Sequence, residues 1–392
     1  MKKVVPTKPA ARRSAKRPPS RNQSRTAKAI VAARRSNNGF PHEKRIETLE
    51  DPLRIVALGG GTGLSTLLKG LKRFAIDGAG PLHSRDPLVD LAAVVTVSDD
   101  GGSSGRLRKD FDILAPGDIR NCLVALAEDE ALLSHLFQYR FSIGRGLQGH
   151  SFGNLFLTAL TDVTGDFHQA LQLSSEVLAI RGRIYPSTLT NVRLEARLLG
   201  GRSVRGESRI SRSADPIQEI RLRPRHCPPL EETLAAISKA DLITLGPGSL
   251  YTSVIPNLLV DGIAAAIAQS PALKVYISNL MWQPGETVGY AASDHLHAIH
   301  RHAGMPLVQY VIANSRRARP AVRRRYQAQN AHPVEVDEEA LQAMGVEVLS
   351  ADLLAEGEIV RHDSEQLARL LAALARKGRR RRVTRARQQR QP

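Results

Sequence analysis

Two segments decide how this chain is expected to fold. Leu53-Arg-Ile-Val-Ala-Leu58 runs directly into Gly59-Gly-Gly-Thr-Gly63, and Asp241-Leu-Ile-Thr-Leu245 runs into Gly246-Pro-Gly-Ser249. Each segment joins a strand-like apolar run to a turn of small residues and then to a helix. Such a turn leaves backbone N–H groups pointing outward, and the helix that follows adds its positive dipole end, so an anion can bind without a lysine. Two such turns predict a ligand that carries a diphosphate.

Strand and helix patterns alternate through the rest of the chain. The apolar run 91–97 suits a strand buried on both faces of a parallel sheet, and runs 273–279 and 307–313 repeat the pattern. A β-hairpin over 192–199 and 203–210 interrupts the alternation, and 314–361 form a cap. The sequence therefore predicts an α/β fold, a Rossmann-like doubly wound sheet with an inserted hairpin and helical cap. Its ligand crevice is expected at the carboxyl ends of the strands.

The formal net charge of +18 is concentrated at the two ends of the chain. Residues 1–50 hold 14 basic and 3 acidic residues, residues 376–392 hold 9 basic and none acidic, and residues 51–375 carry a net charge of −2. Both ends have few large apolar residues, so 1–50 and 376–392 are predicted to be disordered tails around one domain, 51–375. The tails are expected to make nonspecific, salt-sensitive contacts with anions, and a specific nucleic-acid role is the alternative.

The sequence also predicts in which cellular compartment the protein is found. No apolar run is long enough to span a bilayer, so no transmembrane segment is predicted. Cys122 and Cys227 are the only cysteines and have no partner spacing, which favours the reducing cytoplasm. An N-terminal transit peptide is a weaker reading, because the Pro18-Pro19 pair breaks any amphipathic helix there.

The pair Asp99 and Asp100 follows the strand-like run 91–97. A carboxylate at a strand end can hold a ribose hydroxyl, bind Mg²⁺ through water or act as a base. Both are predicted to point into the same edge of the crevice, and they are candidate catalytic residues and Mg²⁺ ligands if the protein is an enzyme. A solvated turn would have a similar composition.

Two further groups have equally plain structural explanations. Asp118 is expected to cap the helix that begins near Pro116, whereas Arg120 is a candidate partner of Asp99, of Asp100 or of a ligand phosphate. His150 and Asn154 are four residues apart and can face one ligand, although core packing or capping explains them equally well.

Several enzyme motifs are absent from the chain. The first glycine turn lacks the Gly-Lys-Ser/Thr ending of a P-loop, and no Gly-x-Ser-x-Gly elbow follows a strand. The histidines at 295, 297, 300 and 302 are expected to lie on a solvated helix face rather than to bind zinc.

An ordered set of motifs resembles the YvcK-type gluconeogenesis-factor family, which is related in fold to the CofD 2-phospho-L-lactate transferases. The motifs cover roughly residues 53–350. They are Leu58-Gly-Gly-Gly-Thr-Gly-Leu64, Val97-Ser-Asp-Asp-Gly-Gly-Ser-Ser-Gly-Arg-Leu107, Pro116-Gly-Asp-Ile-Arg-Asn121, Gly149-His-Ser-Phe-Gly-Asn154, Leu245-Gly-Pro-Gly-Ser249 and Gln283-Pro-Gly-Glu-Thr287.

The resemblance implies a CofD-like fold that binds a nucleotide sugar of the UDP-N-acetylglucosamine type. It implies a cytosolic regulatory factor that links gluconeogenic growth to cell-wall synthesis and cell shape, with cell-wall synthesis proteins as partners and a homo-oligomer as a further expectation. The transferase branch implies the alternative, a Mg²⁺-dependent enzyme acting on a nucleoside diphosphate ester. Mg²⁺ is the one cofactor that this alternative needs.

The resemblance also implies ligand-binding residues. The two glycine turns would contact the diphosphate or the sugar, Asn154 and Asn279 the base or the ribose, Tyr290 would stack on the base and Arg325 would pair with phosphate. Trp282 departs from the small polar residue expected at its position. The predicted ligand-binding set is Gly60, Gly61, Thr62, Gly63, Asp99, Arg120, Asn154, Gly246, Gly248, Ser249, Asn279, Tyr290 and Arg325.

Overall fold

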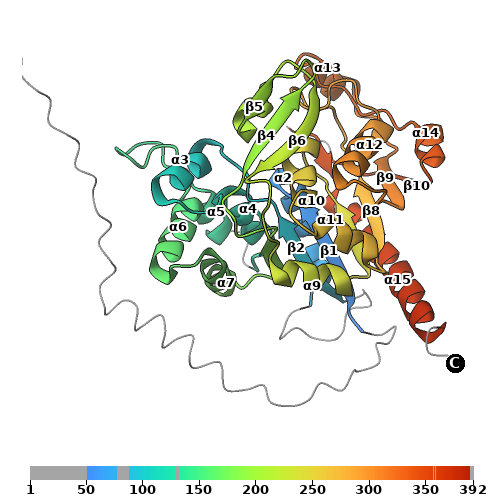
Figure 1. The fold of residues 1–392 in the computed structure, drawn as a ribbon, viewed down its shortest axis with the longest axis horizontal. Coiled ribbons are helices and arrows are strands. Elements are labelled where there is room, and N and C mark those ends of the chain that lie inside the picture. The colour runs from blue at the N-terminus through green and yellow to red at the C-terminus, as the bar shows by residue number, and fades with distance from the viewer. Residues whose placement is uncertain (1–50, 77–87, 129–131, 356, 358, 389–392) are drawn as a thin grey trace, which may run out of the picture.

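A seven-stranded parallel sheet forms the centre of the computed structural model, which describes residues 51–76, 88–128, 132–355, 357 and 359–388 (Figure 1). The strand order is β10-β9-β8-β7-β1-β2-β3, and every neighbouring pair is parallel. The strands are β1 (Leu53–Gly59), β2 (Val89–Val95), β3 (Arg183–Pro186), β7 (Leu242–Leu245), β8 (Leu273–Ile277), β9 (Tyr310–Asn314) and β10 (Glu347–Ala351). The predicted doubly wound α/β fold is confirmed.

Helices cover both faces of this sheet. One face carries α2 (Gly61–Leu71), α4 (Pro116–Leu126) and α15 (Ser364–Gln388), and α2 packs against both of the others. On the other face lie α9 (Glu231–Lys239), η2 (Leu250–Val254), α10 (Ile255–Leu258), α11 (Ile263–Gln269) and α12 (Ala292–Ala303) (Figure 1). The strands are buried on both faces, as their continuous apolar sequences require.

The remaining elements surround this core. Beside α4 lie α3 (Gly102–Phe111), α5 (Leu132–Gln138), α6 (Phe152–Thr164) and α7 (Phe167–Val177). The cap contains α13 (Pro320–Gln327), α14 (Glu338–Ala343), β11 (Leu354–Ala355) and β12 (Arg361–His362), and the short helix η1 spans Lys72–Phe74.

The predicted hairpin is present as part of a small three-stranded antiparallel sheet. It consists of β4 (Arg193–Leu198), β5 (Ser203–Arg205) and β6 (Ile217–Arg223), in the order β5-β4-β6. The turn glycines, Gly200 and Gly201, both have positive φ, which a hairpin turn favours. The second predicted strand is shorter than expected, because the chain enters the short helix α8 (Glu207–Ile210).

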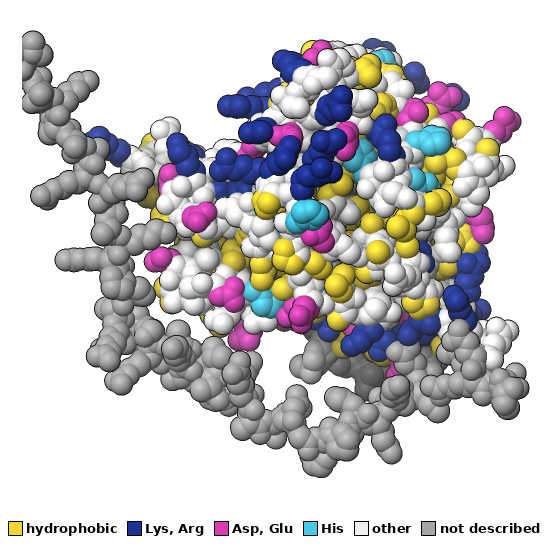
Figure 2. Space-filling view, in the orientation of Figure 1, with side chains coloured by type: hydrophobic (Ala, Val, Ile, Leu, Met, Phe, Trp, Pro, Cys, Tyr) yellow, Lys and Arg dark blue, Asp and Glu magenta, His cyan; other side chains and the backbone are white. Residues whose placement is uncertain are grey.

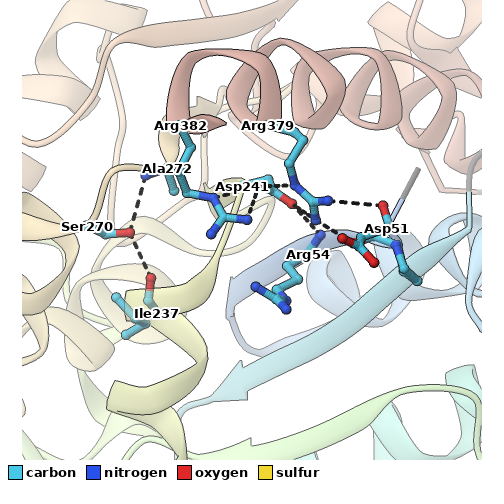
Figure 3. Close-up of polar contacts among 9 residues, drawn as sticks. Asp51, Arg54, Ile237, Asp241, Ser270, Ala272, Arg379 and Arg382 are labelled. Atoms are coloured by element: carbon cyan, nitrogen blue, oxygen red, sulfur yellow. Dashed lines mark hydrogen bonds and ion pairs between the residues drawn. The ribbon is translucent and has the colours of Figure 1, made fainter. Parts of the chain in front are cut away.

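The prediction of a disordered tail over 376–392 is wrong as far as Gln388. Residues up to that point continue α15, whose Arg379 side chain points at Asp241 (Figure 3). Arg379 is only 1% exposed. Its guanidinium forms a two-pronged ion pair with Asp241, with Nε–Oδ1 at 2.8 Å and Nη2–Oδ2 at 2.7 Å. A fully buried carboxylate attracts this part of the arginine run onto the sheet, which charge counting could not show. Residues 1–50 and 389–392 lie outside the described residues.

Candidate functional site

The first glycine turn presents an open helix N-terminus. β1 ends at Gly59, Gly60 is extended, and α2 begins at Gly61 with φ of +62°. The Gly61 N–H donates to Asp118. Within the described part of the chain, the N–H groups of Thr62 and Gly63 have no acceptor, as expected at the start of a helix. This turn therefore has the geometry of an anion site.

The second glycine turn lies directly against the first. A Cβ on Gly63 would stand 2.5 Å from the Pro247 carbonyl oxygen and 2.9 Å from Gly248 Cα. Only glycine at position 63 allows this approach of the two backbones. β1 and β7 are neighbours in the sheet, so their carboxyl ends bring the two turns together.

The helix after the second turn does not offer its N–H groups to a ligand. Gln283 Oε1 accepts from the Leu250 N–H at 3.3 Å, and Glu286 Oε2 accepts from the Tyr251 N–H at 3.3 Å. Gln283 Nε2 also donates to Ser249 Oγ at 2.6 Å. The Gln283-Pro-Gly-Glu-Thr287 motif thus supports the second turn and occupies the first N–H groups of the helix that follows it. The predicted phosphate contact at the second turn itself stays a prediction.

Both turns line one cavity of about 350 Å³, which we call the glycine crevice. Trp282, Tyr326 and Arg361 also line it. A second cavity of about 610 Å³ shares residues 279–282 with it and extends past the end of β9. Together the two cavities have the size and the polar-aromatic lining of a small-molecule site at the carboxyl ends of the strands.

The structure gathers about half of the predicted ligand-binding residues around the glycine crevice. Gly246 has a φ of +82° at the end of β7 and is not among the lining residues. The lining residues that the sequence had indicated are Gly60, Gly61, Thr62, Gly63, Gly248, Ser249 and Asn279.

Two predicted ligand residues, Tyr290 and Arg325, do not line the crevice. The Tyr290 hydroxyl shares a 2.8 Å hydrogen bond with that of Tyr251, and Arg325 Nη2 donates to the Gly357 carbonyl at 3.0 Å. The aromatic and cationic positions at the crevice are Trp282, Tyr326 and Arg361, which the sequence had not indicated. Tyr326 follows Arg325 directly, so the structure places the neighbour of Arg325, and not Arg325 itself, at the crevice.

Asp99 and Asp100 turn toward different neighbours. Asp99 Oδ1 accepts from the Gly101 N–H at 2.8 Å, and its Oδ2 lies so close to Gly117 that a Cβ there would stand 2.5 Å away. Asp100 Oδ1 accepts from the Ser208 N–H at 2.9 Å. The prediction that both acids point into the same edge of the crevice is wrong, because successive side chains of an extended segment face opposite ways.

Asp118 occupies a different position from the predicted one. Ala115 is the N-cap of α4 and Asp118 lies in its first turn. Burial and the nearby Asp99 carboxylate raise the pKa of Asp118 to about 7. Burial also raises the pKa of Glu207 to about 9, with Asp118 and Asp99 adding to the effect. The site therefore contains carboxyl groups that hold protons near neutral pH, which is common at functional sites.

The raised pKa of Asp118 predicts a pH-dependent cost in stability. The folded protein retains a proton up to about pH 7, whereas an unfolded aspartate loses it near pH 4, so stability falls as pH rises through this window. Asp118→Asn keeps the oxygen that accepts from Gly61 and cannot ionise. With EDTA present, we expect the variant to gain on the order of 2 kcal/mol over the wild type by pH 8, and little at pH 4.

Urea unfolding at pH 4, 6 and 8 measures this difference. Asp110→Asn, at an exposed aspartate of α3, is the matched control and should show no such trend. A constant difference between Asp118→Asn and the wild type across the pH series would contradict the assignment.

Asp99 and Asp118 fit a Mg²⁺ ion only if a ligand phosphate supplies further oxygen ligands. The described residues contain no group of three His, Cys, Asp or Glu side chains arranged to hold a metal. Asp99 and Asp118 repel each other at the end of the first glycine turn, and a cation between them and a ligand phosphate would relieve that repulsion. Mg²⁺ characteristically binds one or two carboxylates together with substrate phosphates.

Arg120, His150 and Asn154 form a buried polar cluster beside these acids. Arg120 Nη1 donates to Ser151 Oγ at 2.8 Å, and the guanidinium forms no ion pair with Asp99 or Asp100, two of its three candidate partners. The third, a ligand phosphate, stays a prediction. His150 Nδ1 and Asn154 Nδ2 both contact Ser103 Oγ, at 3.0 and 3.2 Å. These contacts explain His150 and Asn154 without a ligand, although the Asn154 Oδ1 remains buried with no partner among the described residues.

The prediction of a solvated histidine face on α12 is wrong for two of its members. His295 is completely buried and stacks on Tyr276, with ring centroids 6.3 Å apart. His302 Nε2 accepts from the Ile220 N–H at 3.0 Å. Burial lowers the pKa of both rings, which favours their neutral forms, although His302 is only half-buried.

Comparison with known proteins agrees with this architecture. Residues 55–354 match the family model described as 2-phospho-L-lactate transferase CofD. The chain belongs to the CofD family. Among relatives of this CofD-family chain, the "Gluconeogenesis factor" of Halalkalibacterium halodurans is 48% identical over 80% of the chain and 94% of the relative. The "Gluconeogenesis factor" of Bacillus subtilis is 46% identical over 82% and 98%.

A solved structure is also similar. A crystal structure of a Bacillus halodurans protein superposes with a TM-score of 0.77 at 46% identity, covering 82% of this CofD-family chain and 99% of that one. Within the described residues, no single helix is both long and apolar enough to cross a membrane, although the bent pair Leu250–Leu258 and Ile263–Gln269 passes that test by length and composition.

Proposed function

We propose that this protein is a cytoplasmic regulatory factor required for gluconeogenic growth, and that it binds a nucleotide sugar of the UDP-N-acetylglucosamine type in the glycine crevice. Relatives named gluconeogenesis factor, 46–48% identical over most of their length, support the first part. One observation carries the second part. Two glycine turns touch at the end of β1 and β7, and both line one cavity with an open helix N-terminus.

The proposed ligand can be matched to the cavity walls. Its diphosphate would accept from the N–H groups of Thr62 and Gly63 and pair with Arg361. Trp282 and Tyr326 offer flat aromatic faces for the base. The adjoining 610 Å³ cavity leaves room for the rest of the ligand and contains Arg317 and Arg323. We further propose that cell-wall synthesis proteins bind to or dissociate from this protein when the crevice is occupied, which would change cell-wall synthesis and cell shape. The proposal also includes a homo-oligomer.

A second candidate is a Mg²⁺-dependent transferase acting on a nucleoside diphosphate ester. The raised pKa values of Asp118 and Glu207 favour it, because perturbed carboxyl groups next to a phosphate site are typical of catalysts. Bound Mg²⁺ would neutralise charge on the acids and the diphosphate. Asp99 or Asp118 would then position or deprotonate the attacking hydroxyl.

Calorimetric titration of UDP-N-acetylglucosamine with Mg²⁺, combined with an assay for UDP, tests both candidates. We expect binding without release of UDP. Arg361→Ala should weaken binding about tenfold, as expected for loss of one charge-assisted phosphate contact, whereas Lys69→Ala, at an exposed lysine in the last turn of α2, should change it less than twofold. Absence of binding would overturn the nucleotide-sugar proposal, and Mg²⁺-dependent UDP release would establish the transferase.

A further inference from the structure

A second concentration of charge lies outside the glycine crevice. The outer face of the small sheet carries arginines on all three strands, and Figure 2 shows basic side chains gathered over the region of β4, β5 and β6. Between this sheet and α3 lies a cavity of about 760 Å³, which we call the arginine cavity. Seven basic side chains and a single acid, Asp100, line it.

The walls of the arginine cavity bring together like charges that the fold does not neutralise. Arg193 on β4 stands directly opposite Arg223 on β6, an arrangement that destabilises an antiparallel pair. Glu195 is shared, because its two oxygens accept from Arg223 and from Arg205 at 2.7 Å each. The Arg193 side chain is left without a hydrogen bond or ion pair among the described residues.

Two more exposed cations face the same space. Arg209 enters from α8 and Lys109 from α3. Like Arg193, neither side chain has an acidic partner in the described part of the chain. The three unpaired cations around this cavity repel one another, and a bound polyanion would remove that repulsion.

One of the lining cations, Arg108, is buried and held by several hydrogen bonds. Arg108 is 4% exposed, and its guanidinium donates to the carbonyls of Ser98 and Asp99 at 3.1 and 3.0 Å and to Asn191 Oδ1. Burial and then the charge of Arg193 lower the pKa of Arg108, whereas Asp100 and Asp99 act in the opposite direction. Gly102, the first residue of the ten-residue helix α3, also lines the space, and a Cβ there would meet nothing within 4 Å.

We propose that the arginine cavity binds a small molecule carrying at least two phosphate groups. Guanidinium groups match phosphate oxygens in pairs, and the start of α3 adds backbone N–H groups that favour the same anion. The volume lies within the usual range for small-molecule sites. This site shares no lining residue with the glycine crevice, so the proposal does not depend on the ligand of that crevice.

Calorimetric titration of inorganic pyrophosphate at about 0.15 M salt, where long-range attraction is largely screened, tests the proposal. The test variant is Arg193→Ala/Arg209→Ala, which removes two exposed side chains and should leave the thermal midpoint nearly unchanged. The matched control is Arg197→Ala. Arg197 is exposed on the same face of β4 but lies outside the arginine cavity.

We expect the wild type to bind pyrophosphate, the double variant to bind at least tenfold more weakly, and Arg197→Ala to stay within twofold of the wild type. Equal weakening in the control would indicate general charge attraction and would overturn the proposal. Loss of binding in Arg361→Ala instead would place pyrophosphate in the glycine crevice and would also overturn it. A wild type that fails to bind pyrophosphate but binds a poly-glutamate peptide would replace the proposal with an acidic protein partner.

Discussion

Asp241→Ala is expected to destabilise the protein by about 3–5 kcal/mol, because it leaves buried cations without a counter-charge. Asp241 is completely buried, accepts from Arg379 and Arg382, and also accepts from the Arg54 N–H at 2.8 Å (Figure 3). One carboxylate therefore joins the last helix of the chain to the starts of β1 and β7.

Arg379→Ala should cost somewhat less, about 3 kcal/mol, because Arg382 stays within 3.0 Å of Asp241. The Arg379 side chain also donates to the carbonyls of Asp51 and Pro52, which would lose these donors. Gly378 fixes the approach of α15, since a Cβ there would stand 2.0 Å from the Asp241 carbonyl oxygen. No other side chain at position 378 would let Arg379 reach the carboxylate.

Urea unfolding of the full chain provides the measurement. Arg380→Ala is the matched control, because Arg380 is the adjacent exposed arginine of the same helix, and its loss should change stability by less than about 0.5 kcal/mol. If Asp241→Ala and Arg380→Ala unfold at the same urea concentration, the buried ion pair does not hold α15 to the sheet.

The central sheet could be predicted because its signals are local. Apolar runs followed by glycine turns specify buried parallel strands, and β1 and β7 are found where the two runs were read. The fate of the arginine run could not be predicted in this way. Arg379 and Asp241 are 138 positions apart, and nothing near either residue shows that they meet.

The candidate site was predictable only where backbone shape decides it. Glycines from both turns, Gly60, Gly61, Gly63 and Gly248, line one cavity, since neighbouring parallel strands bring their ends together. Side-chain direction was harder to infer, as the divergence of Asp99 and Asp100 shows. For Asp118 the sequence did contain a usable signal. Proline favours the first position of a helix, so Pro116 makes residue 115 the cap and places Asp118 inside the first turn.

The second large effect is expected from Gly63→Ala, which should abolish nucleotide-sugar binding, weakening it at least about 100-fold. The new Cβ would lie 2.5 Å from the Pro247 oxygen and 2.8 Å from its carbonyl carbon. Both are backbone atoms and cannot rotate away, so the two glycine turns must separate. The N–H groups at the start of α2 would then no longer face the wall formed by Gly248 and Ser249.

The same change should destabilise the fold by only about 1–3 kcal/mol, as overpacking at one contact usually does. Binding and stability are therefore expected to separate, with the variant folded but unable to bind. Gly357→Ala is the matched control, because a Cβ there has its nearest neighbour at 3.8 Å. Titration of UDP-N-acetylglucosamine into both variants, with thermal unfolding to check the fold, measures the difference. Wild-type affinity in folded Gly63→Ala would mean that the contact between the two turns does not shape the ligand site.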